Sequence, residues 1–537
     1  MLSYRKLAMR VLGRPLHTEG IDSPRPASQR AAAFILTAAM LTTLAAPAFA
    51  DIWHIENGDI TISAGESGNN VTQNNNTTYG GTNTIITNQN KDTASSHTVT
   101  IEAKDKDDKV EVTLKDVNID TSSRNKAAVS VTGEGDTNIK LDGDNALKSD
   151  IYRSGIYGSG SGSLTISGGE NDSLTAQGGS GANGISSSGS LTISGGTVTA
   201  NGDDGGRGIS SNGGVTISGG STVTANGGSG TISGGDGICS SGGVTISGGS
   251  TVTANGGNGG SLVGGDGIRS GGGLTVSDGT VTAKGGNGDS KDGYGGDGIR
   301  SGGVVTISGN TVNAAGGYGG KVGGYGICSF DRVAISGGTV EAAGGNGSTG
   351  GGSGIYSSVI DLSGSLELTA KAGSPNGKAL SQNGSELVLD TIKDKLGPGA
   401  KVTATDADGK VIDQVSTPRP VEPEESSSSS DGGSAAPSAP ASPLPGLTVT
   451  DKDGQRISYT STQSGNTLTV CVGRLTASFR ISLAALRQLR AEGIETIAFQ
   501  TVLCSTTLSV DELLAMGGEN AEAVLTHRFT DSSLTVG

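Results

Sequence analysis

The chain has 537 residues, of which 95 are glycine and only 3% are aromatic, and its formal net charge is −15. Glycine lies far above its ordinary share of about 7%, so the chain is either disordered or built from a repeat with glycine at fixed positions. The acidic charge excludes binding to nucleic acid or to an anionic membrane through bulk charge.

The first 50 residues have the pattern of a secretory signal. A leader with six basic residues precedes an apolar run over 31–46, and the small-residue sequence at 48–50 offers a cleavage site. We therefore expect Asp51 to begin a protein that is secreted, extracellular or at the cell surface. Without this segment 31 basic and 50 acidic residues remain, the net charge is −19, and no further run is long enough to span a membrane.

Clear repeats occupy residues 154–357. The phrases L/V-T-I-S-G-G and T-V-T-A return in each unit, followed by a Gly/Asn-rich stretch. The dipeptide Gly-Ile marks each unit at intervals of 24 to 31 residues, with isoleucine at Ile156, Ile185, Ile209, Ile238, Ile268, Ile299, Ile327 and Ile355.

Each phrase predicts a short strand with alternating side chains, such as Leu191 and Ile193 inward and Thr192 outward. Three strands joined by glycine turns form one coil, and each strand pairs with its copy in the next coil about 4.8 Å away. A stack of coils buries an apolar core that no single coil can bury. The pattern predicts an all-β protein, with a right-handed parallel β-helix (solenoid) over residues 51–415.

Equivalent positions of successive coils form rows. Asn201, Asn226 and Asn255 share one turn, which predicts an asparagine ladder that Lys284 ends. Outward threonines form a second array, typical either of an exposed strand face or of an ice-binding lattice. Its members are Thr197, Thr199, Thr222, Thr224, Thr251, Thr253, Thr280 and Thr282, and Asn313 and Glu341 interrupt it.

The composition changes after the solenoid. Residues 416–446 are rich in proline and serine and predict a flexible linker. Residues 447–537 predict a small α+β domain, in which Ser482 caps a helix that ends near Gly493. Cys471 and Cys504 fall on its strands, where they either pair or remain buried thiols. We expect this domain to contact a cell-surface partner.

The motif Gly-Gly-Asp-Gly-Ile occurs in three successive coils and stacks Asp236, Asp266 and Asp297 at one turn. Like charges about 5 Å apart repel unless a cation bridges them, and oxygen ligands suit calcium. The sequence therefore makes these aspartates a candidate calcium site. The alternative is three solvated turn residues, where aspartate before glycine is common.

Arg269 and Arg300 follow inward isoleucines and should point outward in adjacent coils, where they either bind an acidic ligand or compensate the aspartates. Tyr294 and Tyr325 are candidate stacking platforms for a sugar. Tyr157 and Tyr356 hold one rung position at opposite ends of the stack. We recognise no combination of catalytic residues in the sequence.

The stretch from Val110 to Ile119 and the G-I-x-S-x-G-x-L-T-I-S-G-G-T-V-T-A coils resemble the secreted carbohydrate-binding-domain proteins of bacteria. These proteins are similar to polysaccharide lyases in their β-helix fold. The resemblance covers roughly residues 90–415, and it implies binding of a plant-type or acidic polysaccharide, with calcium in some members.

Together these patterns favour a non-catalytic protein that binds an extracellular carbohydrate. Three alternatives stay open: a structural or adhesive surface protein without a sugar site, a polysaccharide lyase, and ice binding through the threonine array. Fold alone does not choose among them.

Overall fold

The structure is a computed structural model, and it describes residues 51–309, 311–418, 447–450, 456–457, 459–464, 466–472, 477–501, 505–516, 521–527 and 532–536. The chain divides into two compact units, residues 1–422 and 423–537. The predicted signal segment and nearly all of the predicted linker lie outside the described residues. No helix in the described ranges is both long and apolar enough to cross a bilayer.

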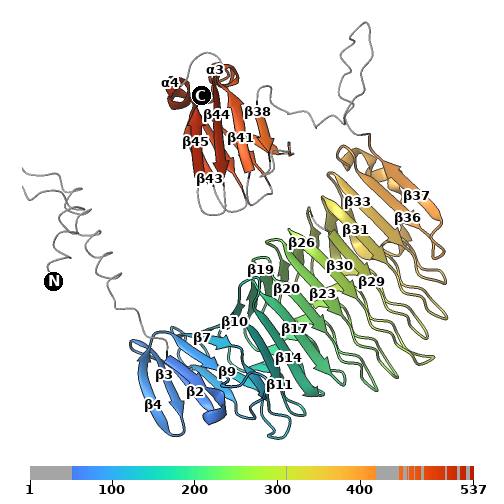
Figure 1. Ribbon diagram of the computed structural model, residues 1–537. Helices are drawn as coiled ribbons and strands as arrows, with labels where there is room; N and C mark the ends of the chain where they lie inside the picture. Colours follow the sequence, from blue (N-terminus) through green and yellow to red (C-terminus); the bar gives the residue numbers. More distant parts are fainter. Residues whose placement is uncertain are drawn as a thin grey trace, which may run out of the picture. The chain divides into compact units, whose positions relative to one another are not determined.

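The first unit is a β-solenoid of about 13 turns, built from three series of strands that stack from coil to coil (Figure 1). The series of first strands is β2 (Ile60–Gly65), β6 (Val99–Ala103), β9 (Val129–Gly133), β12 (Ile156–Gly158), β15 (Ile185–Ser187), β18 (Ile209–Ser211), β21 (Ile238–Ser240), β24 (Ile268–Ser270), β27 (Ile299–Ser301), β30 (Ile327–Ile335), β32 (Ile355–Leu362) and β34 (Leu380–Gln382).

The series of second strands pairs in the same parallel manner, and β30 and β32 continue into it. It consists of β1 (Asp51–His54), β5 (Thr84–Thr87), β7 (Lys109–Lys115), β10 (Asp136–Asp142), β13 (Leu164–Ser167), β16 (Leu191–Ser194), β19 (Val215–Ser218), β22 (Val244–Ile246), β25 (Leu274–Val276) and β28 (Val305–Ile307).

The third series forms a separate 12-stranded sheet. Its members are β8 (Asn118–Asp120), β11 (Asp144–Lys148), β14 (Ser173–Ser180), β17 (Thr197–Asp203), β20 (Thr222–Asn226), β23 (Ser250–Asn255), β26 (Gly279–Lys284), β29 (Thr311–Ala315), β31 (Gly338–Ala343), β33 (Leu366–Lys371), β36 (Lys401–Thr405) and β37 (Val411–Ser416).

Alternation along each strand sends apolar side chains into one continuous core. Ile238, Val244, Ile246, Val252 and Ala254 of a single coil are at most 1% exposed. The equivalent residues of neighbouring coils stack on them in register. This confirms the all-β solenoid that the repeat predicts, because each coil buries its apolar side chains only against the next.

The Gly/Asn-rich stretches are packed layers of backbone rather than open turns. Each stretch folds into two glycine limbs, such as residues 227–230 and 234–237. One row of backbone hydrogen bonds joins the limbs from coil to coil at 2.7–3.0 Å. The row runs through Gly206, Gly228, Gly235, Gly257, Gly265, Gly286, Gly296, Gly317, Gly324, Gly345, Gly352 and Gly373.

Side chains have no room inside these limbs. A Cβ on Gly286 would lie 2.0 Å from the carbonyl oxygen of Gly257, and a Cβ on Gly265 would lie 1.9 Å from that of Gly235. Glycine is therefore required here for close backbone approach, which explains much of the glycine content.

Antiparallel strands close both ends of the solenoid. At the first coils, β2, β3 (Gly68–Gln73) and β4 (Asn76–Gly81) pair antiparallel. At the last coils, β35 (Ser385–Glu386) and β37 pair antiparallel with β34 and β36. Two 3₁₀ helices, η1 (Ile55–Asn57) and η2 (Leu389–Lys395), lie at the same two ends. These elements cover strand edges that would otherwise stay open.

The second unit has two four-stranded sheets and two short helices. In order, one sheet is β38 (Leu447–Thr450), β41 (Ala477–Ser482), β44 (Glu522–His527) and β45 (Ser532–Val536). The other is β39 (Thr460–Ser464), β40 (Thr467–Cys471), β42 (Thr496–Gln500) and β43 (Ser505–Ser509). The helices are α3 (Leu483–Ala491) and α4 (Val510–Met516), and Ser482 Oγ accepts the N–H of Ala485 at the start of α3.

Candidate functional site

One row of side chains runs along the first strands of the solenoid on the side away from the core, with members that range from exposed Tyr157 at 42% to buried Cys328 at 1%. The residue after the inward isoleucine of each coil pairs with its equivalent in the next coil, without a register shift at this position from β9 to β34. We call this row the axial column: Ser130, Tyr157, Ser186, Ser210, Cys239, Arg269, Arg300, Cys328, Tyr356 and Ser381.

The three candidate calcium ligands stack at the turn before this column. Oδ1 of Asp236 accepts the N–H of Asp266 at 2.9 Å, and Oδ1 of Asp266 accepts that of Asp297 at 2.8 Å. Oδ1 of Asp297 accepts the N–H of Tyr325 at 2.7 Å. The predicted stacking is confirmed, but the three aspartates are only 3–5% exposed, so the alternative of solvated turn residues is wrong.

Arginine side chains face the second oxygen of each aspartate. Arg207 Nε lies 3.2 Å from Oδ2 of Asp236, and Arg300 NH1 lies 3.3 Å from Oδ2 of Asp297. Arg269 NH1 is 3.9 Å from Oδ2 of Asp266. The expected charge compensation is therefore present in all three coils, and sequence reasoning missed only Arg207.

Burial and mutual repulsion change the acidity of this row. Burial, with the charges of Asp297 and Asp236, raises the pKa of Asp266 to about 8. Burial also raises the pKa of Asp297 to about 6, against the opposing effects of the Tyr325 N–H and of Arg300. The raised pKa of Asp266 favours the protonated form of the central carboxyl group, which reduces the repulsion within the row.

The geometry of the aspartate row is a poor fit for calcium. Each Oδ1 is occupied by a backbone N–H, and each Oδ2 faces a guanidinium group that would repel a cation. Within the described ranges, no group of three or more His, Cys, Asp or Glu side chains is arranged to hold a metal ion. Calcium binding remains an untested prediction and is not part of the function proposed below.

The candidate ligand-binding residues divide between two places. Tyr325 stacks on Tyr356 with ring centroids 4.9 Å apart, one coil from Arg300, whose guanidinium carbon lies 5.3 Å from the ring centroid of Phe330. Tyr294 belongs instead to a row on the glycine limbs, with Lys321 Nζ 5.5 Å from its ring centroid. We call the first group the upper aromatic site; its members are Arg300, Tyr325, Phe330 and Tyr356.

A groove that the sequence did not single out surrounds Tyr157, near the other end of the axial column. It consists of two adjoining hollows of about 350 and 220 Å³, and both are lined by Arg153 and Tyr157. Tyr157 is 42% exposed there. The larger hollow is also lined by Thr98, Thr100, Asn125, Lys126, Ala127, Ser130, Thr132 and Ser159, and the smaller by Tyr152, Ser154, Gly181, Ala182, Asn183 and Ser186.

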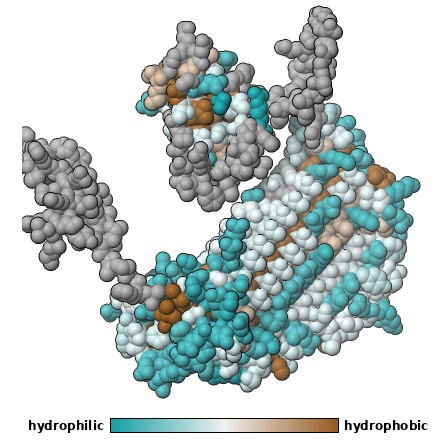
Figure 2. All heavy atoms as spheres, viewed as in Figure 1, coloured by the Kyte–Doolittle hydropathy of each residue, from teal (hydrophilic) through white to brown (hydrophobic). Residues whose placement is uncertain are grey.

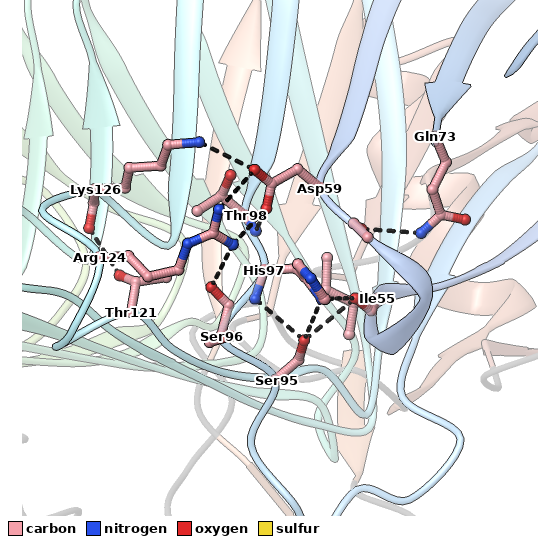
Figure 3. Close-up of polar contacts among 11 residues, drawn as sticks. Ile55, Asp59, Gln73, Ser95, Ser96, His97, Thr98, Thr121, Arg124 and Lys126 are labelled. Carbon is pink, nitrogen blue, oxygen red and sulfur yellow. Dashed lines mark hydrogen bonds and ion pairs between the residues drawn. The ribbon is translucent and has the colours of Figure 1, made fainter. Parts of the chain in front are cut away.

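A network of hydrogen bonds and ion pairs beside the groove holds two of its lining residues, Thr98 and Lys126 (Figure 3). Asp59 accepts hydrogen bonds from Lys126 Nζ at 3.0 Å and from the N–H of Thr98 at 2.9 Å. Arg124 contacts both oxygens of the same carboxylate, at 2.8 and 3.1 Å. Although burial opposes it, these contacts lower the pKa of Asp59 to about 2, so the network stays charged.

The arginine of the groove keeps its charge available. Arg153 Nε donates to Asn125 Oδ1 at 3.2 Å, and in the described part of the chain Arg153 forms no ion pair. The groove thus combines an aromatic ring, hydroxyl groups and a guanidinium group. A sequence signal existed: near 121–127 and 149–155 the turn after the third strand carries Arg, Lys and Tyr where later coils have glycine limbs.

The threonine array and the asparagine ladder lie where the sequence places them. Successive T-V-T-A strands pair in register, and Asn226 Nδ2 donates to Asn201 Oδ1 at 2.8 Å, as Asn255 Nδ2 does to Asn226 Oδ1. The 12-stranded sheet faces the viewer in Figure 1, and Figure 2 shows its surface as pale rows of intermediate hydropathy along the axis. Ice binding by this face stays a prediction.

Neither Cys239 nor Cys328 is a reactive thiolate. Burial raises the pKa of Cys239 to about 11 and that of Cys328 to about 12, so both remain neutral thiols. Cys471 Sγ lies 3.3 Å from Gln500 Oε1, and its predicted partner Cys504 lies outside the described residues.

No family model, curated protein or solved structure matches the chain.

Proposed function

We propose that the solenoid binds an extracellular polysaccharide and that the groove around Tyr157 is its binding site. The observation that carries the proposal is the pair of adjoining hollows lined by two exposed tyrosines, by several hydroxyl groups and by Arg153, which forms no ion pair with the described residues. A pyranose ring presents a C–H face that packs on an aromatic ring, and hydroxyl groups that pair with polar side chains.

The charges of the groove favour an acidic polysaccharide. Arg153 and Lys126 line the larger hollow, and a planar guanidinium group pairs well with a carboxylate or sulfate group. Lys126 is paired with Asp59, which also accepts hydrogen bonds from the Thr98 N–H and from Arg124. The extracellular location rests on the signal pattern of residues 1–50.

The test is a pull-down of the full chain with polygalacturonate and with a neutral glucan, each with calcium and with a chelator. We expect binding to polygalacturonate under both metal conditions, and weaker binding to the glucan. Tyr157→Ala and Arg153→Ala should each weaken binding about tenfold, which corresponds to about 1.4 kcal/mol. Tyr318→Ala is the matched control, because Tyr318 is similarly exposed at 47% but lies on the glycine limbs.

The remaining outcomes separate the other functions. Absence of binding to either polymer would overturn the proposal and favour a structural or adhesive protein. Release of unsaturated sugar from polygalacturonate would favour a lyase. Loss of binding on chelation would show that binding depends on calcium, contrary to the expected result.

A further inference from the structure

The axial column joins two aromatic sites on one continuous strand series. Tyr157 and Tyr356 occupy the same register position, seven coils apart. Parallel strands are about 4.8 Å apart, so the two rings are separated by about 34 Å along the stack. No register shift interrupts the column between them, so both side chains leave the same face of the solenoid.

The upper aromatic site offers the same types of group as the groove. Phe330 is 56% exposed and lies under the guanidinium group of Arg300, and Tyr356 stacks on Tyr325 at an interplanar angle of 18°. Flat, partly exposed rings beside a cation suit the apolar face and the acidic group of a sugar unit. Phe330 lies outside the hydrophobic core, so its contacts with Arg300 are not required for core packing.

Between the two sites, the column has small side chains next to Tyr157 and two arginines nearer to Tyr356. Ser186, Ser210 and Cys239 follow Tyr157 and have small side chains. Ser210 and, beyond Arg300, Cys328 are buried beneath their neighbours. Arg269 and Arg300 come next, with side chains 51% and 38% exposed. Each uses one nitrogen towards a buried aspartate, which leaves further N–H donors of the guanidinium group for a ligand.

We infer that the ligand is a linear acidic polysaccharide that lies along the axial column and contacts the Tyr157 groove and the upper aromatic site at the same time. The inference rests on the proposed function and adds the length and direction of the ligand. Two weak sites on one chain act together, because binding at the first raises the effective concentration at the second. A short oligosaccharide occupies one site only and lacks this gain.

The experiment measures the affinity of the full chain for a length series of oligogalacturonates, from the disaccharide to the polymer. We expect affinity to rise steeply once an oligosaccharide spans about 34 Å. Phe330→Ala and Tyr356→Ala should each weaken polymer binding by about tenfold or more, whereas the affinity of the groove for short oligosaccharides should not change. Phe330→Ala is expected to fold normally, because the Phe330 side chain is largely exposed, so a loss of binding in this variant reports on the site itself.

Two results distinguish this inference from the function on which it rests. If Tyr157→Ala weakens polymer binding while Phe330→Ala and Tyr356→Ala bind it like the unaltered protein, the bridging inference is overturned and the groove remains a sugar site. The same holds if affinity is independent of length. If the unaltered protein binds no oligosaccharide or polymer, the proposed function itself fails.

Discussion

Buried carboxyl groups at a repeated position are the most unusual residues of the solenoid. Asp236, Asp266 and Asp297 could not all be ionised at 3–5% exposure without strong mutual repulsion. Three arginines at the rim pair with the aspartates, and the pKa of Asp266 at the centre of the row is raised. Each Oδ1 still accepts a backbone N–H, so the row also connects successive coils.

Asp266 makes the stability of the solenoid dependent on pH. Its pKa is about 8 in the folded protein and about 3.9 in an unfolded chain, so the protonated form favours folding. This contribution is complete below about pH 4 and is lost as the pH rises towards 8. Asp266→Asn should therefore exceed the unaltered protein in stability by more than about 1 kcal/mol at pH 9, with a smaller difference at pH 5, in thermal unfolding followed by circular dichroism.

The matched control for this prediction is Asp289→Asn, because Asp289 is an exposed aspartate of the glycine limbs. It should change the free energy of unfolding by less than about 0.5 kcal/mol, as expected for an exposed position. An equal pH dependence in Asp266→Asn and the unaltered protein would show that Asp266 does not titrate in this range.

The glycines of the backbone hydrogen-bond row, such as Gly286, are expected to be irreplaceable. Gly286→Ala places a methyl group 2.0 Å from the Gly257 carbonyl oxygen, so the stacked backbone must separate. We expect a loss of about 3 kcal/mol in the free energy of unfolding, measured by denaturant titration. Gly350→Ala is the control, since the nearest atoms to its Cβ are Val322 methyl groups at 3.8 Å. Equal stability of the two variants would contradict the close packing of the limbs.

At the scale of elements, α3 illustrates how a short segment is stabilised by its ends. Ser482 Oγ accepts the Ala485 N–H at 3.2 Å, and Arg490 forms a bidentate pair with Asp511 of α4. Ser482→Ala removes the N-cap and should lower the stability of the second unit by about 1 kcal/mol. Chemical denaturation followed by circular dichroism measures the change.

The control for the cap is Arg487→Ala, an exposed position of the same helix without a cap contact. It should change stability by less than about 0.5 kcal/mol. A Ser482→Ala variant as stable as Arg487→Ala would mean that the observed hydrogen bond contributes nothing in solution.

At the scale of the whole molecule, the end strands are expected to prevent edge-to-edge association of solenoids. β37 pairs along the edge of β36. Its residue Val415 is only 7% exposed and belongs to the hydrophobic core. Val415→Asp should release β37 and expose an unpaired strand edge, because a buried charge without a partner is costly. We expect concentration-dependent self-association in size-exclusion chromatography with light scattering.

Ile412→Asp is the matched control for the end strand, because Ile412 lies on β37 but is 50% exposed. It should keep the oligomeric state of the unaltered protein. If Val415→Asp also keeps that state at every concentration, β37 is not required to protect the edge.

The sequence by itself determined the repeat, the strand positions and the rows, because hydrophobic alternation and a unit of nearly constant length leave one consistent stacking. The ladder from Asn201 to Asn255, the stacked aspartates and the shared position of Tyr157 and Tyr356 all follow from that register. Ser482 at the start of α3 follows from local cap chemistry.

Only the tertiary structure decided how residues from different turns meet. The glycine stretches pack as paired limbs because backbone hydrogen bonds cross between coils, which no local pattern encodes. The burial of Asp266 and its protonation depend on neighbours 30 and 31 residues away. The Tyr157 groove likewise requires three loops from successive coils to converge on the first strand series, so its arginine could not be assigned from sequence spacing alone.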